Sequence, residues 1–334
     1  IMFQERIEFI QRNFGRLFSQ DSDVIFFNPE TPSNCLSLSL DKLVAYQTFF
    51  PVFDQLKTAG IKCVHSMSQQ KYNTAIISIP KSKKLARHFI YLATKAVPEG
   101  LIIVDGDKSN GIESIIRDLK NETKVTNVVS KAHGKIAWFE TPANLGTYKD
   151  FPLQIEDGFE TQAGIFSSDG VDPASKLLMQ VIPKRLKGLG ADLGGGWGYL
   201  SAKALEKTLI NELYFIEADL RALNKAKRNV CDERVKFYWC DALKWQAPTL
   251  LDFIIMNPPF HFLGRPMPSL GVDFIKVASR NLKKSGTLWM VANRHLPYEE
   301  VIKAQFSTFS ELPGSKRFKV IRAENPRKNS FRNL

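Results

Sequence analysis

The stretch ADLGGGWGYLS, residues 191–201, decides how the second half of this chain is interpreted. It lies between a short strand pattern, GLGADL (188–193), and a helix pattern, YLSAKALEK (199–207). Its acid and glycines form the pattern D-x-G-x-G-x-G, which consists of Asp192, Gly194, Gly196 and Gly198. Glycine lets the backbone turn sharply and approach a ligand closely. The pattern predicts a strand, a ligand-binding loop and a helix, with a plain tight turn as the alternative.

Outward from this loop, strand and helix patterns alternate along the second half of the chain. The strand patterns are residues 188–193, 212–217, 234–240, 251–256, 286–292 and 317–323, and the helix patterns are residues 172–186, 199–207, 219–230 and 271–284. The first of these helices has Asp172 as a candidate N-cap and Pro173 at its first position. The alternation predicts an α/β fold with a parallel, doubly wound sheet and helices on both faces.

Two acids follow the strands after the glycine loop. Glu217 ends one strand, where an acid can bind both hydroxyls of a ribose, and Asp241 follows the next strand, where it can accept from an adenine amine. The glycine spacing differs from G-x-G-x-x-G, which serves a pyrophosphate. A nucleoside ligand without phosphates, such as S-adenosylmethionine, fits this combination. Exposed acids at strand ends are the alternative for each position.

The stretch IIMNPPFHF, residues 254–262, places an amide, two prolines and a ring directly after an apolar strand pattern. Two prolines end a strand and stiffen the backbone after it. The Asn257 oxygen and the Pro258 carbonyl, which Pro259 fixes, can each accept one hydrogen of a planar amine, while Phe260 stacks on the base. The nitrogen lone pair then points at a sulfonium methyl, and catalysis rests on orientation and electrostatics. The alternative is a proline-rich loop with a core phenylalanine.

A segment of the first half repeats the order found around the N-P-P-F motif. A strand pattern (74–81), a helix pattern (84–97) and a glycine-led strand (100–106) follow one another. Ser78, Ile79 and Pro80 stand where the second half has Asn257, Pro258 and Pro259. The first half lacks a glycine-rich loop, and DVIFFNPE (23–30) is its counterpart. We therefore predict two tandem domains, 1–150 and 151–334, of which the first is degenerate. A general α/β pattern shared by chance is the alternative.

Composition narrows the partners and the compartment. The 334 residues carry a formal net charge of +12, which favours a polyanion, although solvated surface lysines give the same balance. Four isolated cysteines without a C-x-x-C pair or a histidine cluster predict no metal site and suit a reducing cytoplasm. Charged residues near the N-terminus exclude a secretory apolar region there, and no apolar run approaches the roughly 20 residues of a membrane span.

These motifs together resemble the class I S-adenosylmethionine-dependent methyltransferases that act on amino nitrogens. Further stretches resemble the bacterial ribosomal RNA guanine-N2 methyltransferases, and in particular the small-subunit type C group. They are GIFSSDGVDPASKLL (164–178), NPPFH (257–261), VANRHLPYEEVI (291–302) and RFKVIRA (317–323), with IPKSKK (79–84), GLIIVDGDKSNGIES (100–114) and SKAHGKIAWF (130–139) in the first half. The resemblance spans nearly the whole chain. It implies a degenerate N-terminal methyltransferase-like domain, used for RNA docking or structural support, before a catalytic one.

The resemblance also implies roles for individual residues. The cofactor S-adenosylmethionine is expected on the glycine loop, on Glu217 and under Phe166 of GIFS, for which a core phenylalanine is the alternative. Asp241 stays a cofactor candidate from its place after a strand. Asn257 to Phe260 form the expected target pocket. Gly195 and Trp197 depart from the family, in which these positions are often cysteine and a small residue; Trp197 is expected to narrow the cofactor mouth.

The resemblance implies methyl transfer to guanine N2 in ribosomal RNA. The expected substrate is 16S RNA or the assembled small subunit, and the enzyme is expected to be a cytoplasmic monomer. Two basic clusters are candidate RNA contacts: 316–332, with Phe318 and Phe331, and the set Lys81, Lys83, Lys84 and Arg87. Solvated surface is the alternative for both. Three rival functions stay open: methylation of adenine N6 or of protein glutamine, a non-catalytic RNA-binding protein on this fold, and, more distantly, a nicotinamide dehydrogenase.

Overall fold

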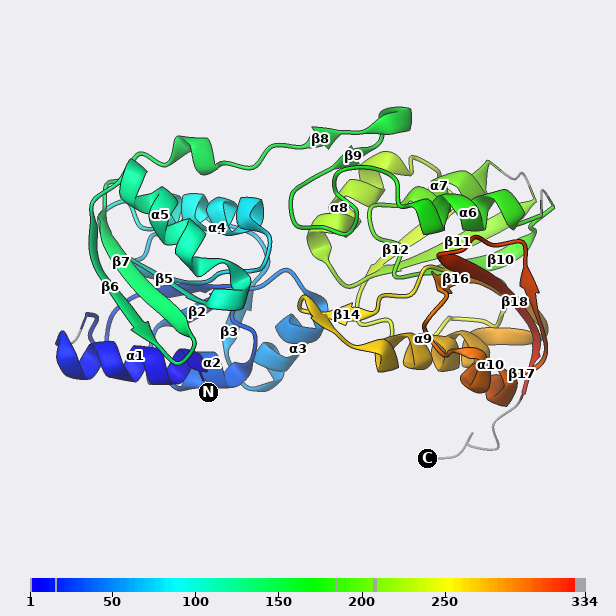
Figure 1. Ribbon diagram of the computed structural model, residues 1–334, viewed down its shortest axis with the longest axis horizontal. Coiled ribbons are helices and arrows are strands. Elements are labelled where there is room, and N and C mark those ends of the chain that lie inside the picture. The colour runs from blue at the N-terminus through cyan, green and yellow to red at the C-terminus, as the bar shows by residue number, and fades with distance from the viewer. Residues whose placement is uncertain (1, 16, 184, 207–208, 328–334) are drawn as a thin grey trace. The chain divides into compact units, whose positions relative to one another are not determined.

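The chain divides into two compact units, residues 1–151 and 152–334, which are described one at a time. Figure 1 shows the computed structural model, which describes residues 2–15, 17–183, 185–206 and 209–327. Each unit contains one seven-stranded sheet with helices on both faces. This confirms the expected α/β architecture with two tandem sheets.

The sheet of the first unit has the strand order β3-β2-β1-β4-β5-β7-β6. Its strands are β1 (Val24–Phe27), β2 (Leu43–Tyr46), β3 (Lys62–Val64), β4 (Thr74–Ser78), β5 (Gly100–Asp107), β6 (Val125–Lys131) and β7 (Gly134–Thr141). Its helices are α1 (Met2–Asn13), α2 (Pro32–Leu36), α3 (Phe50–Thr58), α4 (Lys83–Ala96) and α5 (Ile112–Glu122), with short 3-10 turns at Lys108–Asn110 and Gly146–Tyr148. In Figure 1, α4 and α5 cover one face of this sheet, and α1 and α3 lie on the other.

The sheet of the second unit has the order β12-β11-β10-β13-β16-β18-β17. Its strands are β10 (Gly188–Leu193), β11 (Ile210–Glu217), β12 (Val235–Trp239), β13 (Leu251–Met256), β16 (Leu282–Asn293), β17 (Phe306–Leu312) and β18 (Phe318–Pro326). Its helices are α6 (Pro173–Val181), α7 (Tyr199–Leu205), α8 (Leu220–Asn229), α9 (Pro268–Asn281) and α10 (Glu299–Gln305), with a 3-10 turn at Glu156–Gly158. Two small hairpins complete it: β8 (Leu153–Gln154) with β9 (Glu160–Thr161), and β14 (His261–Phe262) with β15 (Arg265–Pro266).

Alternate residues along each strand point to opposite faces, and this period of two builds two core layers per sheet. In the second unit, Leu193 of β10 packs in one layer with Phe274 of α9. Phe215 of β11 packs in the other layer with Leu200 of α7 and Leu223 of α8. The sheet therefore lies between α9 and α10 on one face and α6, α7 and α8 on the other.

The parallel sheet expected in the second unit is a mixed sheet, and the sheet of the first unit is mixed in the same way. The first five strands of each order pair in parallel, but β7 is antiparallel to β5 and β6, and β18 is antiparallel to β16 and β17. The cause is the length of the connections. Only two residues join β6 to β7 and five join β17 to β18, and a parallel pair needs a crossover of a dozen or more.

Element boundaries deviate where proline or an edge strand decides them. The helix predicted at 172–186 ends at Val181, just before Pro183, and the helix predicted at 271–284 begins earlier, with Pro268 at its first position. The sequence pattern does not predict the strand β17, because it lies at the sheet edge with mostly exposed side chains and no apolar run. The predicted cap is confirmed: the Asp172 carboxylate accepts a hydrogen bond from the Ser175 N–H at 2.8 Å.

The two sheets match in register around their first strands. Asn28 follows β1 and Gly194 follows β10, and each donates its N–H to a carbonyl on the neighbouring strand, Tyr46 and Ile216 respectively, at 2.9 Å. Both residues have a positive φ, 58° for Asn28 and 73° for Gly194. The same strand order and the same turn conformation therefore recur in both halves, as a duplication predicts.

Among the described residues, no helix is both long and apolar enough to cross a membrane.

Candidate active site

A cleft at the carboxyl ends of β10 and β13 brings together residues from five parts of the second unit. Its lining consists of Gly194, Gly195, Gly196 and Trp197 from the glycine loop, Tyr199 and Leu200 from α7, Asp172 and Ser175 from the start of α6, and Phe166 and Asn257. The structure thus brings together Asn257, Phe166, Gly194 and Gly196 of the predicted site residues. The other predicted residues lie outside this lining.

The three glycines of the motif have positive φ but serve different purposes. Gly196 (φ 60°) opens into the cleft, because a Cβ there would meet only the Phe166 ring, at 3.9 Å. Gly198 (φ 100°) begins α7, and a Cβ there would lie 2.7 Å from the Val230 side chain beyond α8. Gly196 leaves room for a ligand, whereas Gly198 permits close packing of α7 against α8.

Packing explains why position 195 is a glycine. A Cβ at this position would lie 2.3 Å from the ring of Phe215, which is fully buried on β11 beneath the loop. Trp197 is also buried, and its ring packs 5.2 Å from that of Phe159. Its indole N–H donates to the Ser167 carbonyl at 3.3 Å, which ties the segment carrying Phe166 to the glycine loop. Trp197 therefore anchors the rim of the cleft as well as lining it.

Glu217 supports the glycine loop from the end of β11. Its Oε2 accepts the Gly196 N–H at 2.7 Å, and its Oε1 accepts the Asp219 N–H at 2.7 Å. Burial raises the pKa of this carboxyl to about 7, and the two N–H donors oppose that rise. The position agrees with an acid poised next to the cofactor loop, and ribose binding remains a prediction.

Asp192 is fully buried and therefore does not face the cleft. Its Oδ2 accepts the Ser201 hydroxyl at 2.7 Å, and burial raises the pKa of the carboxyl to about 7. Its Oδ1 has no hydrogen-bond partner within the part of the chain that the structure describes. Asp192 holds β10 to α7 in this structure, and its prediction as a cofactor contact stays untested.

Asp241 lies two residues beyond β12, outside the cleft lining. Its Oδ1 accepts the Leu243 N–H at 2.9 Å, which sets a local turn. No contact with the glycine loop is seen for its described side chain, so the expected bond to adenine stays a prediction that only a bound nucleoside can test.

The N-P-P-F motif begins directly at the end of β13. The Asn257 Nδ2 donates to Asp172 Oδ2 at 2.9 Å and to Ser175 Oγ at 3.0 Å. The sequence predicts Asp172 only as a helix cap, and the contact with Asn257 went unrecognised, because the two positions are 85 residues apart. A helix-capping acid before an apolar helix gives no signal of what lies across the fold from it.

The rest of the motif forms one wall beside the glycine loop. Pro258 is buried, and the Pro259 ring lies 3.7 Å from where a Cβ on Gly194 would stand. Phe260 is half-buried and packs against the core layer of α9. Its ring centroid is 4.2 Å from that of His261, whose side chain is exposed. Phe260 thus belongs partly to the core, and its stacking on a base stays a prediction.

Phe166 lies at the mouth of the cleft rather than in the core. Its side chain is 57% exposed, which is unusual for a phenylalanine. The next residue, Ser167, has a φ of 49°. An exposed ring beside Gly196 suits a cover for a flat ligand and contradicts the alternative of a core phenylalanine.

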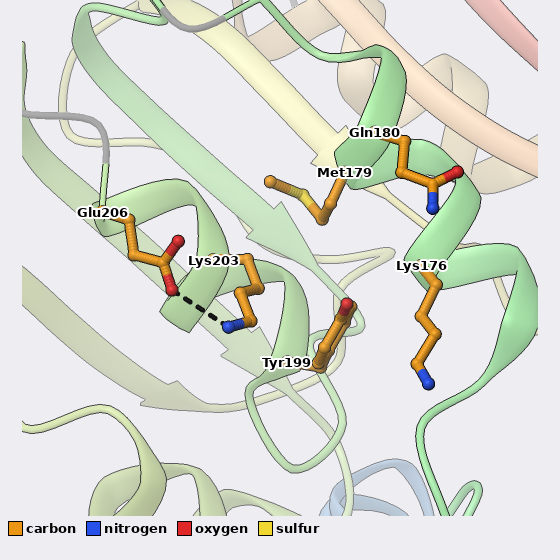
Figure 2. A pocket seen from close by; sticks show the side chains of 6 residues that line it. All are labelled: Lys176, Met179, Gln180, Tyr199, Lys203 and Glu206. Atoms are coloured by element: carbon orange, nitrogen blue, oxygen red, sulfur yellow. Dashed lines mark hydrogen bonds and ion pairs between the residues drawn. The ribbon is translucent and has the colours of Figure 1, made fainter. Parts of the chain in front are cut away.

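A second, wider hollow of about 220 Å³ lies between α6 and α7 and shares Tyr199 with the cleft. Figure 2 shows the residues that line it, with Lys176, Met179 and Gln180 on α6 and with Tyr199, Lys203 and Glu206 across from that helix. Lys176 pairs with Glu156 at 2.8 Å, and Lys203 pairs with Glu206 at 3.0 Å. Since both lysines already have acidic partners, this hollow has little charge to offer an anion.

The expected basic clusters are mostly engaged in the fold. Lys83 and Arg87 both pair with Asp118, at 2.7 and 2.5 Å. In the C-terminal cluster, Lys319 is 2% exposed and binds Glu299 and the Leu296 carbonyl, so it is unavailable to phosphate. The part of this cluster that includes Phe331 and Arg332 lies outside the described residues. Within those residues, no group of three or more acids, cysteines or histidines could hold a metal ion.

Two family models match the chain. The model for the methyltransferase small domain matches residues 156–322, and the model for the N-terminal part of such proteins matches residues 8–146. The chain belongs to the methyltransferase small domain family. The first match contains the whole cleft, and the second contains the sheet of the first unit.

Curated relatives of this methyltransferase match most of its length. Ribosomal RNA small subunit methyltransferase C of Shewanella loihica is 28% identical over 322 residues, which cover 90% of this chain and 94% of the relative. The protein of the same name from Acinetobacter baylyi is 28% identical over 267 residues, which cover 75% of this chain and 78% of the relative.

A solved structure shares the fold of both units. The 16S rRNA N2 G1207 methyltransferase (RsmC) of T. thermophilus, in complex with AdoMet and guanosine, superposes with a TM-score of 0.77 at 22% identity. The match covers 96% of this chain and 92% of that chain. At this identity the likeness concerns the fold.

Proposed function

We propose that this methyltransferase transfers a methyl group from S-adenosylmethionine to the N2 amine of a guanine in ribosomal RNA, with 16S RNA of the small subunit as the substrate. The observation that carries the proposal is the placement of Asn257, whose amide lies in the same cleft as the glycine loop. The names of the curated relatives, and the AdoMet and guanosine bound to the T. thermophilus structure, support the cofactor and the substrate class.

The residues of the cleft fit a nucleoside cofactor without phosphates. Gly196 leaves open space beside the exposed Phe166 ring, and Glu217 stands behind the loop with a carboxylate that can accept hydroxyl hydrogens. When bound, S-adenosylmethionine supplies an electrophilic methyl group on a sulfonium. Glu217, the backbone of Gly194 to Gly196 and the Phe166 ring would hold it.

The chemistry assigned to the protein is orientation of the amine. Asn257 Oδ1 and the Pro258 carbonyl each accept one N2 hydrogen, which turns the nitrogen lone pair toward the methyl carbon. Transfer of the sulfonium methyl group would form the N–C bond as the C–S bond breaks, and the amine held in this way would then lose one proton to water. The guanine must leave its stack to reach Asn257, at a cost of a few kcal/mol.

Partners and location follow the same proposal. We place the enzyme in the cytoplasm as a monomer acting on the RNA or on the assembled small subunit. Residues 152–334 carry the catalytic role. Residues 1–151 support the fold or dock RNA, because the first unit has neither the glycine loop nor the amide of the motif.

Methyl transfer from radiolabelled S-adenosylmethionine tests the function. Small-subunit RNA, large-subunit RNA and the assembled subunits are offered separately, and the methylated nucleoside is identified by mass spectrometry. N2-methylguanosine in the small-subunit substrate is the expected result. N6-methyladenosine, labelled protein, or the absence of transfer to every substrate would overturn the proposal; absence together with no S-adenosylmethionine binding would favour an RNA-binding protein.

A further inference from the structure

Both hydrogens of the Asn257 amide are already engaged within the protein. Asp172 Oδ2 accepts one at 2.9 Å, and Ser175 Oγ accepts the other at 3.0 Å. Ser175 is buried and Asp172 is half-buried. An amide group has two N–H donors and one oxygen, so these two contacts exhaust its donors.

These contacts fix which way the amide faces. If it turned over, Oδ1 would face the carboxylate of Asp172, and two acceptors would oppose each other without a hydrogen between them. The N–H donors would then point into the cleft and lose both partners. Leaving a polar group unpaired in a buried site is unfavourable, so the observed orientation of the amide is strongly preferred.

The consequence is a substrate edge made only of acceptors. Asn257 presents its oxygen, and neither Pro258 nor Pro259 has an N–H to donate. A base that presents two N–H donors, as an exocyclic amine does, finds a partner for each. A base that presents a carbonyl at that point meets another acceptor and is rejected, because its oxygen and that of Asn257 both lose hydration without a bond.

We propose that Asp172 and Ser175 are positioning residues that hold the Asn257 amide by both hydrogens, so that the site accepts an amine and excludes a carbonyl. This rests on the proposed function of the cleft and deepens it by assigning the origin of amine selectivity. The Asp172 carboxylate also polarises the amide, which places more negative charge on the oxygen that faces the developing positive nitrogen.

Asp172 also caps α6, and a test of its role in holding Asn257 must leave that cap in place. The oxygen that receives Asn257 also accepts the Ser175 N–H at 2.8 Å and caps α6. Asp172→Ser keeps a good N-cap, because serine and aspartate cap about equally well, but its hydroxyl is too short to reach Asn257 as well. Asp232→Ser is the matched control, since Asp232 also accepts a backbone N–H, from Arg234 at 3.0 Å, before the start of β12 and away from the cleft.

The decisive experiment is a double-variant cycle on methyl transfer to the small-subunit substrate. We expect Asp172→Ser to lower kcat about 10–100-fold and Ser175→Ala about threefold to tenfold, with the affinity for S-adenosylhomocysteine unchanged. In the Asn257→Ala background, Asp172→Ser should have no further effect, because its partner is gone. Asp232→Ser should leave kcat unchanged. Independent, multiplying effects of Asp172→Ser and Asn257→Ala would overturn the proposal.

A readout that needs no turnover separates this inference from the proposed function. The two Asn257 side-chain amide protons, assigned by their loss in Asn257→Ala, are followed by NMR. Protection from solvent exchange in the wild type, lost in Asp172→Ser at an unchanged melting temperature, supports the clamp. Fast exchange in the wild type overturns it. If the wild type methylates no RNA, the proposed function fails, while this measurement still decides how Asn257 is held.

Discussion

The two halves of the chain share a strand order but differ in one hydrogen bond to the loop after the first strand: the side chain donates it in the first half and accepts it in the second. Gln47, directly after β2 in the first unit, corresponds to Glu217, the last residue of β11 in the second. Gln47 Oε1 accepts the Phe49 N–H at 2.9 Å, as Glu217 Oε1 accepts that of Asp219 at 2.7 Å. The other end of each side chain differs, because Gln47 Nε2 donates to the Pro29 carbonyl at 2.9 Å, where Glu217 accepts from the loop.

The loop after the first strand differs in the same sense. In the first unit, Asn28 donates its side-chain N–H to the Ser78 carbonyl at 2.9 Å and thereby links the ends of β1 and β4. In the second unit the matching positions are Gly194, which has no side chain, and Asn257, which lines the cleft. The fold tolerates either arrangement. What separates a site from a closed sheet end is whether the polar groups there bind each other or stay available to a ligand.

The largest expected effect comes from the amide itself. Asn257→Ala should lower turnover by about 10²–10³, because an acceptor for the transition state is lost, while S-adenosylhomocysteine still binds. Ser78→Ala, at the corresponding position of the first unit, should leave turnover unchanged. Methyl-transfer rates and calorimetric titration of both variants measure the contrast. Equal losses would mean that the two strand ends are not functionally different.

The next effect comes from exchanging the acid and the amide between the halves. Glu217→Gln gives the second unit the side chain of the first and sets an N–H group against that of Gly196. We expect affinity for S-adenosylhomocysteine to fall roughly 10–100-fold, since hydrogen bonds to a charged group are worth about 1.5–3 kcal/mol. Gln47→Glu should lower the melting temperature without creating a second binding site. A stoichiometry of two in that variant would contradict the comparison.

A smaller effect is expected from pH, because burial raises the pKa of Glu217 to about 7. The Glu217 carboxylate, which we propose accepts ribose hydrogens, is fully formed only above that pH. Affinity for S-adenosylhomocysteine should therefore weaken between pH 8 and pH 6, by up to about tenfold for one group one unit below its pKa. The dependence should shrink in Glu217→Gln. A flat profile in the wild type would show that the ionised form is not needed.

The smallest effect concerns the stability of the fold. Asp192 on β10 is a titratable acid, whereas the corresponding residue on β1 is Phe26, which cannot titrate. Burial raises the pKa of Asp192 to about 7 from an ordinary value near 4, so the folded state holds a proton that the unfolded state releases between those values. Its contribution to stability therefore falls as pH rises from about 4 to about 7 and is constant above. The melting temperature of Asp192→Asn minus that of the wild type should therefore be larger at pH 8 than at pH 5.

How far the sequence predicts this structure depends on the range of each interaction. The glycine loop, the N-P-P-F motif and the cap at Asp172 are local patterns, and the structure places them as expected. The antiparallel strands were missed because β17 is an exposed edge strand, and the bond between Asp172 and Asn257 was missed because it joins positions far apart in the chain. Gly198 also meets a packing requirement against Val230, which no local pattern reveals, and its role in binding the ligand stays a prediction.

The bond between Gln47 and Pro29 makes the closed state of the first unit hard to reverse by single mutations. Restoring an acid at position 47 alone would set its carboxylate against the Pro29 carbonyl. Replacing Pro29 by glycine alone would leave the amide donor in place and free a backbone that proline now restrains. Neither change alone would reproduce the arrangement of the second unit, and the first unit also lacks a glycine loop and an asparagine at position 78. Turning its sheet end into a binding site would require several changes together.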